Sequence, residues 1–63
     1  MKPNDFRAFL SLCKERGLAE WQVAELLGCG RNSITSWKRG GAPLYVGLAV
    51  AALEEGLKPW TAK

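Results

Sequence analysis

The fold is decided by residues 20–37, which read EWQVAELLGCGRNSITSW. Apolar residues at helical spacing lie on both sides of Gly28-Cys29-Gly30, a run that cannot sustain a helix. The segment therefore predicts one helix over residues 20–27 and a second over residues 31–38, joined by a tight turn. Ala24 is small where the two helices would cross, and Gly28 can take a positive φ without steric cost. The positions expected to face a shared core are all apolar: Val23, Leu27, Cys29, Ile34 and Trp37.

Two further helices are predicted outside this pair. Upstream, residues 5–16 carry apolar side chains at helical spacing, and Gly17 ends that run. Downstream, Pro43 is expected to open a helix, because proline is favoured at the first helical position, and Gly56 is expected to end it. The sequence contains no strand pattern and no repeat. The predicted fold is all-α, with four short helices in one domain of residues 1–63.

The length and composition of the chain limit the classes of protein to which it can belong. A chain of 63 residues has room for a single small domain, whose stability is marginal without some aid. There is no histidine, the two cysteines form no CxxC pair, and no signal peptide is recognisable, so we expect no disulfide, metal or cofactor. No apolar run approaches the ~20 residues of a membrane span. We expect a cytoplasmic protein with no membrane partner, for which oligomerisation is the remaining aid to stability.

The segment of residues 20–37 resembles the helix-turn-helix of the lambda-repressor/Cro-like family. Arg39-Gly40 and Pro43 resemble that family's loop into a fourth helix, so the resemblance spans roughly residues 5–56. It implies a small stand-alone regulator of the phage or prophage type that places the second helix of the pair in the major groove of duplex DNA. The family usually has serine or threonine as a cap and then a phosphate-binding glutamine, where this chain has Ala19 and Glu20. A carboxylate repels phosphate, so Gln22 or Trp21 is expected to act instead.

The helix of residues 31–39 can also be interpreted without the family. One broad face carries cations and short hydrogen-bonding side chains, and it contains no acid. Arginine binds guanine through two hydrogen bonds, and asparagine can read adenine. Base contacts are therefore predicted for Arg31, Asn32, Thr35 and Ser36. Phosphate contacts, which position the protein without specifying sequence, are predicted for Gln22, Lys38, Arg39 and the amides of Gly40 and Gly41.

Each of these assignments has a plainer alternative. Arg31 in the first turn opposes the helix dipole at a cost of roughly 0.3–1 kcal/mol, which a DNA contact would offset, but it can also be an incidental surface arginine. Asn32 can bond the nearby backbone at the start of the helix. Lys38 and Arg39 can be solvated charges.

The fourth predicted helix is apolar on all sides, which is typical of a helix buried on all sides. One side can cover the core and the other can receive a partner. We expect the core side to hold Leu44, Leu48, Ala51 and Ala52. A symmetric homodimer is predicted through Val46, Val50, Leu53, Leu57 and Trp60. Its two recognition helices would meet half-sites about 34 Å apart on a palindromic operator.

The expected function is that of a sequence-specific regulator of transcription that binds double-stranded DNA, a repressor or autorepressor. The same motif also serves DNA-binding accessory proteins, such as excisionases or packaging-recognition domains, and sequence does not separate these. A third alternative is a protein-interaction module, against which the acid-free helix argues. An enzyme is not expected, because histidine is absent and neither cysteine has a plausible base nearby.

Overall fold

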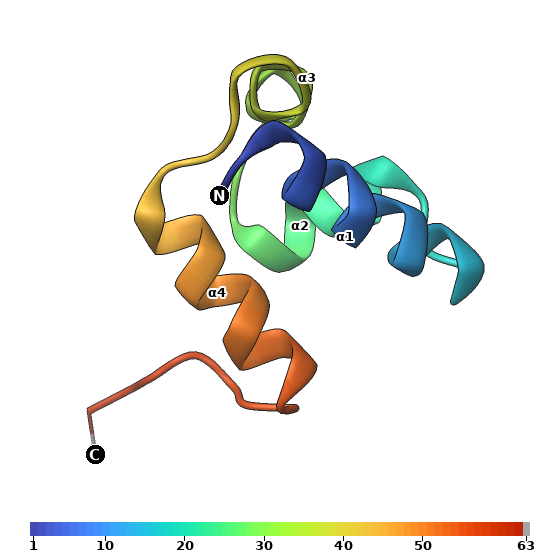
Figure 1. The fold of residues 1–63 in the computed structure, drawn as a ribbon. Helices are drawn as coiled ribbons and strands as arrows, with labels where there is room; N and C mark the ends of the chain where they lie inside the picture. Colours follow the sequence, from blue (N-terminus) through green and yellow to red (C-terminus); the bar gives the residue numbers. More distant parts are fainter. Residues whose placement is uncertain (63) are drawn as a thin grey trace.

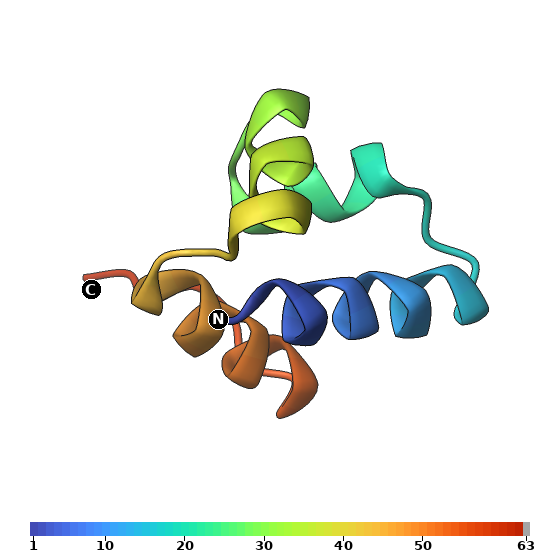
Figure 2. The same cartoon turned by 45° about the horizontal axis from the view of Figure 1, so that its top comes forward.

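The chain forms four helices in a computed structural model that describes residues 1–62. They are α1 (Pro3–Glu15), α2 (Glu20–Leu27), α3 (Arg31–Gly40) and α4 (Leu44–Glu54). Residues 1–62 contain no strand, and the predicted all-α fold with four helices is confirmed. Figures 1 and 2 show α1 running along one side of the α2–α3 pair, with α4 crossing near the start of α1. A tail of residues 57–62 turns back from the end of α4 and runs clear of the helices (Figure 1).

Proline and glycine set several of the helix ends. Pro3 lies in the first turn of α1, so this helix begins two residues before the predicted start at Asp5; proline fits there because its missing N–H would have no partner in the helix. Gly28 ends α2 with a φ of 71°, in the left-handed region that glycine adopts without strain. Pro43 is the N-cap of α4 rather than its first residue, a correction of one position.

The hydrophobic core is built from one side of every helix. Phe6 is fully buried, and its ring meets Trp37 edge-on with centroids 5.6 Å apart. This confirms the prediction that Trp37 faces the shared core. Ala24 is buried where α2 meets α3. The buried apolar residues are Phe6, Phe9, Leu10, Cys13, Val23, Ala24, Ile34 and Val46.

The connection between α3 and α4 is held by the beginning of the chain. The Met1 nitrogen donates to the Ala42 carbonyl at 2.8 Å, and the Ala42 N–H donates to the Met1 carbonyl at 2.9 Å. Gly41 lies beside this pair with a φ of 90°, and a Cβ at Gly41 would lie 2.6 Å from the Met1 oxygen. At the other end of α4, Arg16 and Glu54 form an ion pair of 3.1 Å that links α4 to the end of α1.

The orientation of α4 is the reverse of the one predicted. Val46 is 2% exposed and belongs to the core, and Val50 and Leu53 pack against it. The prediction that these three residues form a dimer interface is therefore wrong, because the protein's own core occupies that side of α4. The exposed side carries Leu44 and Leu48, which are 78% and 64% exposed. Leu57 and Trp60 of the tail are exposed, as a surface for a partner requires.

Candidate nucleic-acid interface

The exposed face of α3 gathers the residues predicted to contact bases. Opposite this face, Ile34 is buried and Trp37 is half-buried, so α3 is fixed to the core by its apolar side. None of the ten residues of α3 is acidic. The exposed residues with polar side chains are Arg31, Asn32, Thr35, Ser36 and Arg39. We call these five residues the α3 face.

The first turn of α3 has no anionic group of its own. Gly30 is the N-cap and supplies no side-chain hydrogen bond, and the first turn contains no acidic residue. Helices leave their first N–H groups without partners inside the helix, and this end carries partial positive charge. Arg31 adds a full positive charge at the same place. The start of α3 is therefore suited to a negatively charged or hydrogen-bond-accepting partner.

Trp21 lies beside this first turn. It is 54% exposed and lines a hollow of about 260 Å³ together with Arg31, Thr35, Glu20 and Ile34. The sequence predicts that Gln22 or Trp21 acts in place of the family's glutamine, and the structure places Trp21 at the edge of the α3 face. In the sequence, only its position as the second residue of α2 indicates that Trp21 lies near α3. The start of α2 comes close to α3 in a helix-turn-helix arrangement.

Gln22 has a local structural task. Its side-chain oxygen accepts a hydrogen bond from the Ala19 N–H at 2.8 Å. Ala19 is the N-cap of α2 and has no side chain that could cap the helix, so Gln22 supplies this half of the capping interaction from inside the helix. Its carboxamide nitrogen is the part left to donate to a phosphate. The predicted phosphate contact of Gln22 is thereby limited to that nitrogen.

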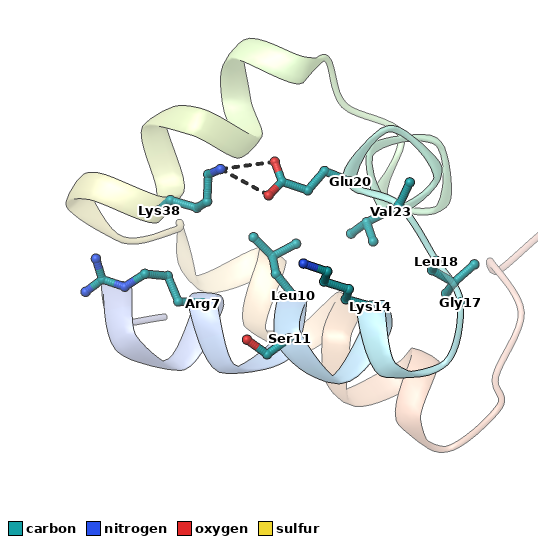
Figure 3. A pocket seen from close by; sticks show the side chains of 10 residues that line it. Arg7, Leu10, Ser11, Lys14, Gly17, Leu18, Glu20, Val23 and Lys38 are labelled. Carbon is teal, nitrogen blue, oxygen red and sulfur yellow. Dashed lines mark hydrogen bonds and ion pairs between the residues drawn. The ribbon is translucent and has the colours of Figure 1, made fainter.

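Lys38 is engaged in an ion pair. Its Nζ lies 3.0 Å and 3.1 Å from the two carboxylate oxygens of Glu20, the residue that the sequence marked as unfavourable for phosphate (Figure 3). Lys38 is half-buried, unlike the residues of the α3 face. A phosphate contact by Lys38 therefore requires competition with Glu20. Arg39 is exposed and remains a phosphate candidate.

The amides of Gly40 and Gly41 are not available to a ligand. The Gly41 N–H donates to the Trp37 carbonyl at 3.0 Å. Gly40 is the last residue of α3, where the amide donates to the carbonyl four residues earlier. The prediction that these two amides bind phosphate is wrong, because the helix extends two residues beyond the predicted end at Lys38 and uses both.

A larger hollow is lined by two cations that were not among the predicted site residues. It has a volume of about 660 Å³ and lies between α1, α2 and the second half of α3 (Figure 3). Arg7 and Lys14 of α1 line it together with Lys38 and Glu20. We call it the α1 hollow. The spacing of seven residues between Arg7 and Lys14 corresponds to two helical turns, so the sequence indicates that both lie on one face of α1.

The two cysteines are free thiols set among apolar neighbours. Burial raises the pKa of Cys13, and Glu54 adds to this rise while Arg16 opposes it. Burial likewise raises the pKa of Cys29. A thiol with a raised pKa is protonated at neutral pH and is a poor nucleophile or metal ligand. Within residues 1–62, no three side chains of histidine, cysteine, aspartate or glutamate cluster as a metal site would need.

No helix in the described part of the chain combines the length and apolar character that crossing a bilayer requires. Comparison with protein-family models, with curated proteins and with solved structures finds no match to the chain. A functional assignment therefore depends on the geometry and chemistry of the residues described above.

Proposed function

We propose that the protein is a sequence-specific regulator of transcription of the lambda-repressor/Cro type that binds double-stranded DNA in the cytoplasm. In this proposal, α3 enters the major groove, and a homodimer occupies a palindromic operator as a repressor or autorepressor. The observation that carries the proposal is the α3 face: five exposed polar or cationic residues, with no acid on the helix, above a side anchored by Ile34.

The chemistry of the α3 face suits base edges. The major groove of B-DNA admits an α-helix, and arginine at its start can bind guanine O6 and N7 in a bidentate manner. Thr35 and Ser36 are short, so they allow the helix backbone to approach the groove floor, and each has a hydroxyl to donate or accept. Thr35 Oγ1 donates to the Arg31 carbonyl at 3.3 Å in the free protein. Arg39 lies two turns beyond Arg31, where a phosphate of the flanking backbone would be met.

A second copy of the chain is proposed for the exposed side of α4. The accessible surface is 4903 Å², whereas a compact folded monomer of 6.9 kDa exposes about 4,000 Å². Exposed apolar side chains of α4 and of the tail contribute to this excess. The residues that would form the interface with the second copy are Leu44, Tyr45, Leu48, Leu57 and Trp60.

Dimerisation would supply both stability and specificity. A small domain gains stability from a partner through mass action, so DNA occupancy would depend on the concentration of the protein itself. A two-fold dimer also presents two copies of α3 to half-sites one helical turn apart. These consequences fit an autorepressor.

Selecting bound sequences from a pool of random duplexes tests the proposal. We expect enrichment of a palindrome whose half-sites are about 10–10.5 base pairs apart. Absence of any enriched sequence would contradict the proposal. A reporter gene placed behind the selected operator then separates repression from an accessory role, because an accessory protein would bind without lowering transcription.

A further inference from the structure

We propose that the tail of residues 57–62 from one copy docks in a hollow beside α2 of a second copy. This inference rests on the homodimer of the proposed function, and it gives the tail a place on the partner. The hollow has a volume of about 430 Å³ and is lined by Leu18, Trp21, Gln22, Glu25 and Leu26. We call it the α2 hollow.

The α2 hollow presents apolar surface that the fold leaves in contact with water. Leu18, in the connection between α1 and α2, is half-buried and packs against the core. Trp21 and Leu26 of α2 are each 54% exposed. Exposed apolar side chains gathered around a hollow favour association with an apolar partner.

The charge of the α2 hollow limits the kind of partner that fits. Glu25 is the only charged residue in the lining, and α2 has no basic residue in its last turn. The Glu25 carboxylate therefore lies near the negative end of the helix, where a cation is favoured. Within residues 1–62, Glu25 belongs to no ion pair. The lining thus favours an apolar segment that carries one positive charge.

The tail has this composition. Lys58 is the one charged residue of residues 57–62, and it belongs to no ion pair of the described part of the chain. Leu57 and Trp60 are exposed on either side of it in the sequence. Trp60, at 87%, is the most exposed large apolar side chain that the structure describes. The tail therefore complements the α2 hollow in both charge and apolar character.

The start of the tail is fixed by the end of α4. The Gly56 N–H donates to the Leu53 carbonyl at 3.0 Å. The Leu57 N–H donates to the Ala52 carbonyl at 2.9 Å. Together these bonds form the usual glycine-based end of a helix, which sets the point at which the tail leaves α4.

Pro59 restricts the rest of the tail. Proline fixes its own φ and favours an extended backbone at the preceding residue, Lys58. In the polyproline II form of extended backbone, three residues make one turn, so Leu57 and Trp60 would lie on the same side. A segment restricted in this way loses less conformational entropy when it binds.

The tail of a second copy fits the α2 hollow better than the tail of the same copy. Both views of the fold show the tail ending on the opposite side of the molecule from the connection between α1 and α2, where Leu18 lies (Figures 1 and 2). The tail also continues from α4, whose exposed side carries the proposed interface. Under two-fold symmetry each copy gives one tail and receives one, so the assembly closes as a dimer.

The first experiment reverses the charges of Glu25 and Lys58. Sedimentation equilibrium at low salt measures the dimer Kd of the parent, of Glu25→Lys, of Lys58→Glu and of an equimolar mixture of the two variants. Like charges meet at both tail contacts of each single variant, so we expect a dimer about 5- to 30-fold weaker than the parent. The mixed dimer has opposite charges at both contacts and should regain the parental Kd.

The control for charge reversal is Arg7→Glu. Arg7 is exposed on α1 and lines neither the α2 hollow nor the tail, so this variant should dimerise as the parent does. Glu25 and Lys58 are exposed as well, so all three variants should keep the parental helix content.

The second experiment locates the tail on the partner. In an equimolar mixture of isotope-labelled and unlabelled parent, isotope-filtered NOEs report only contacts between copies. We expect NOEs from the Trp60 ring to the methyl groups of Leu18 and Leu26. NOEs from Trp60 to Leu44 and Leu48 alone would place the tail on the partner's α4 and overturn the inference.

The outcomes separate this inference from the function on which it rests. A parent that dimerises but binds no duplex contradicts the proposed function, and the dimer Kd values still decide the inference. Single variants that dimerise as the parent does overturn the inference alone. Weakened single variants whose mixture is not restored would assign the α2 hollow to the tail of the same copy, which also overturns it. A monomeric parent removes both the proposed homodimer and the inference.

Discussion

Arg31 begins α3 with a guanidinium at the positive end of the helix, in a turn that has neither an acidic residue nor a side-chain cap. Such a cation destabilises the helix by roughly 0.3–1 kcal/mol. The binding free energy of a guanine contact would exceed this cost. Arg31 therefore destabilises the folded protein and stabilises its complex with DNA.

Replacing Arg31 by alanine should therefore act in opposite directions on the two properties. We expect Arg31→Ala to lose roughly 1–3 kcal/mol of DNA binding and to relax specificity at one base position. The free energy of unfolding should stay the same or rise slightly, because the unfavourable charge is gone. Binding titrations over single-base operator variants, together with urea unfolding, measure both effects. Lys2→Ala, which removes an exposed charge outside the α3 face, should bind as the parent does; equal losses in the two variants would exclude a specific role for Arg31.

Cys13 and Cys29 predict a pH dependence of stability at the alkaline end. Burial raises the pKa of both thiols above the ordinary value of 9.0, so the folded state holds these protons more tightly than the unfolded state does. Their contribution to stability is therefore fully present below pH 9.0 and is lost as pH rises through the higher folded-state pKa. Urea unfolding at pH 7 and at pH 10 should show a larger loss for the parent than for Cys13→Ala. Equal losses would contradict the raised pKa.

At the scale of the elements, the pair α2–α3 and the turn between them could be predicted because the signals are local. The spacing of apolar residues predicts both helices, and Gly28 has the positive φ that the turn between them requires. The start of α1 lies two residues before the predicted start at Asp5, because Pro3 occupies the first turn and apolar spacing does not mark that turn. The end of α3 was missed by two residues because Arg39-Gly40 was treated as loop.

The orientation of α4 could not be predicted from its own residues. Apolar side chains surround this helix, so no polar side marks the direction of solvent. The choice is made by contacts between distant parts of the chain, such as the burial of Val46 in the core and the Met1–Ala42 pair, whose members are 41 positions apart. The same holds for the α1 hollow, since nothing local to Arg7 or Lys14 indicates that Lys38 lies nearby.

Gly40 and Gly41 are adjacent glycines that should respond to alanine with opposite signs. Gly41 has a φ of 90°, a conformation that side chains rarely adopt, and a Cβ there would lie 2.6 Å from the Met1 oxygen. We expect Gly41→Ala to destabilise the fold by about 1–3 kcal/mol. Gly40 lies in the helix, and a Cβ there would meet nothing within 4 Å, so Gly40→Ala should be neutral or stabilise by up to about 1 kcal/mol. Thermal unfolding measures both, and equal effects would contradict the described loop geometry.

At the scale of the whole molecule, substitutions on the two sides of α4 should affect folding and dimer formation differently. Leu48 is exposed and Val46 is buried, so aspartate at position 48 should leave the monomer folded but disrupt the proposed dimer. Sedimentation equilibrium at micromolar concentration should give twice the monomer mass of 6.9 kDa for the parent. It should give the monomer mass itself for Leu48→Asp. A strictly monomeric parent would remove the dimer from the proposal and leave the DNA-binding surface standing.

The central claim is that the α3 face contacts duplex DNA while the opposite side of α3 stays on the core. Amide NMR shifts recorded while a selected duplex is added at low salt test it most directly, because they report on every element at once. The account predicts the largest changes at Arg31, Asn32, Thr35 and Ser36, with little change at Leu44 and Leu48 beyond that caused by assembly. No shift with any duplex, or shifts confined to α4, would contradict it.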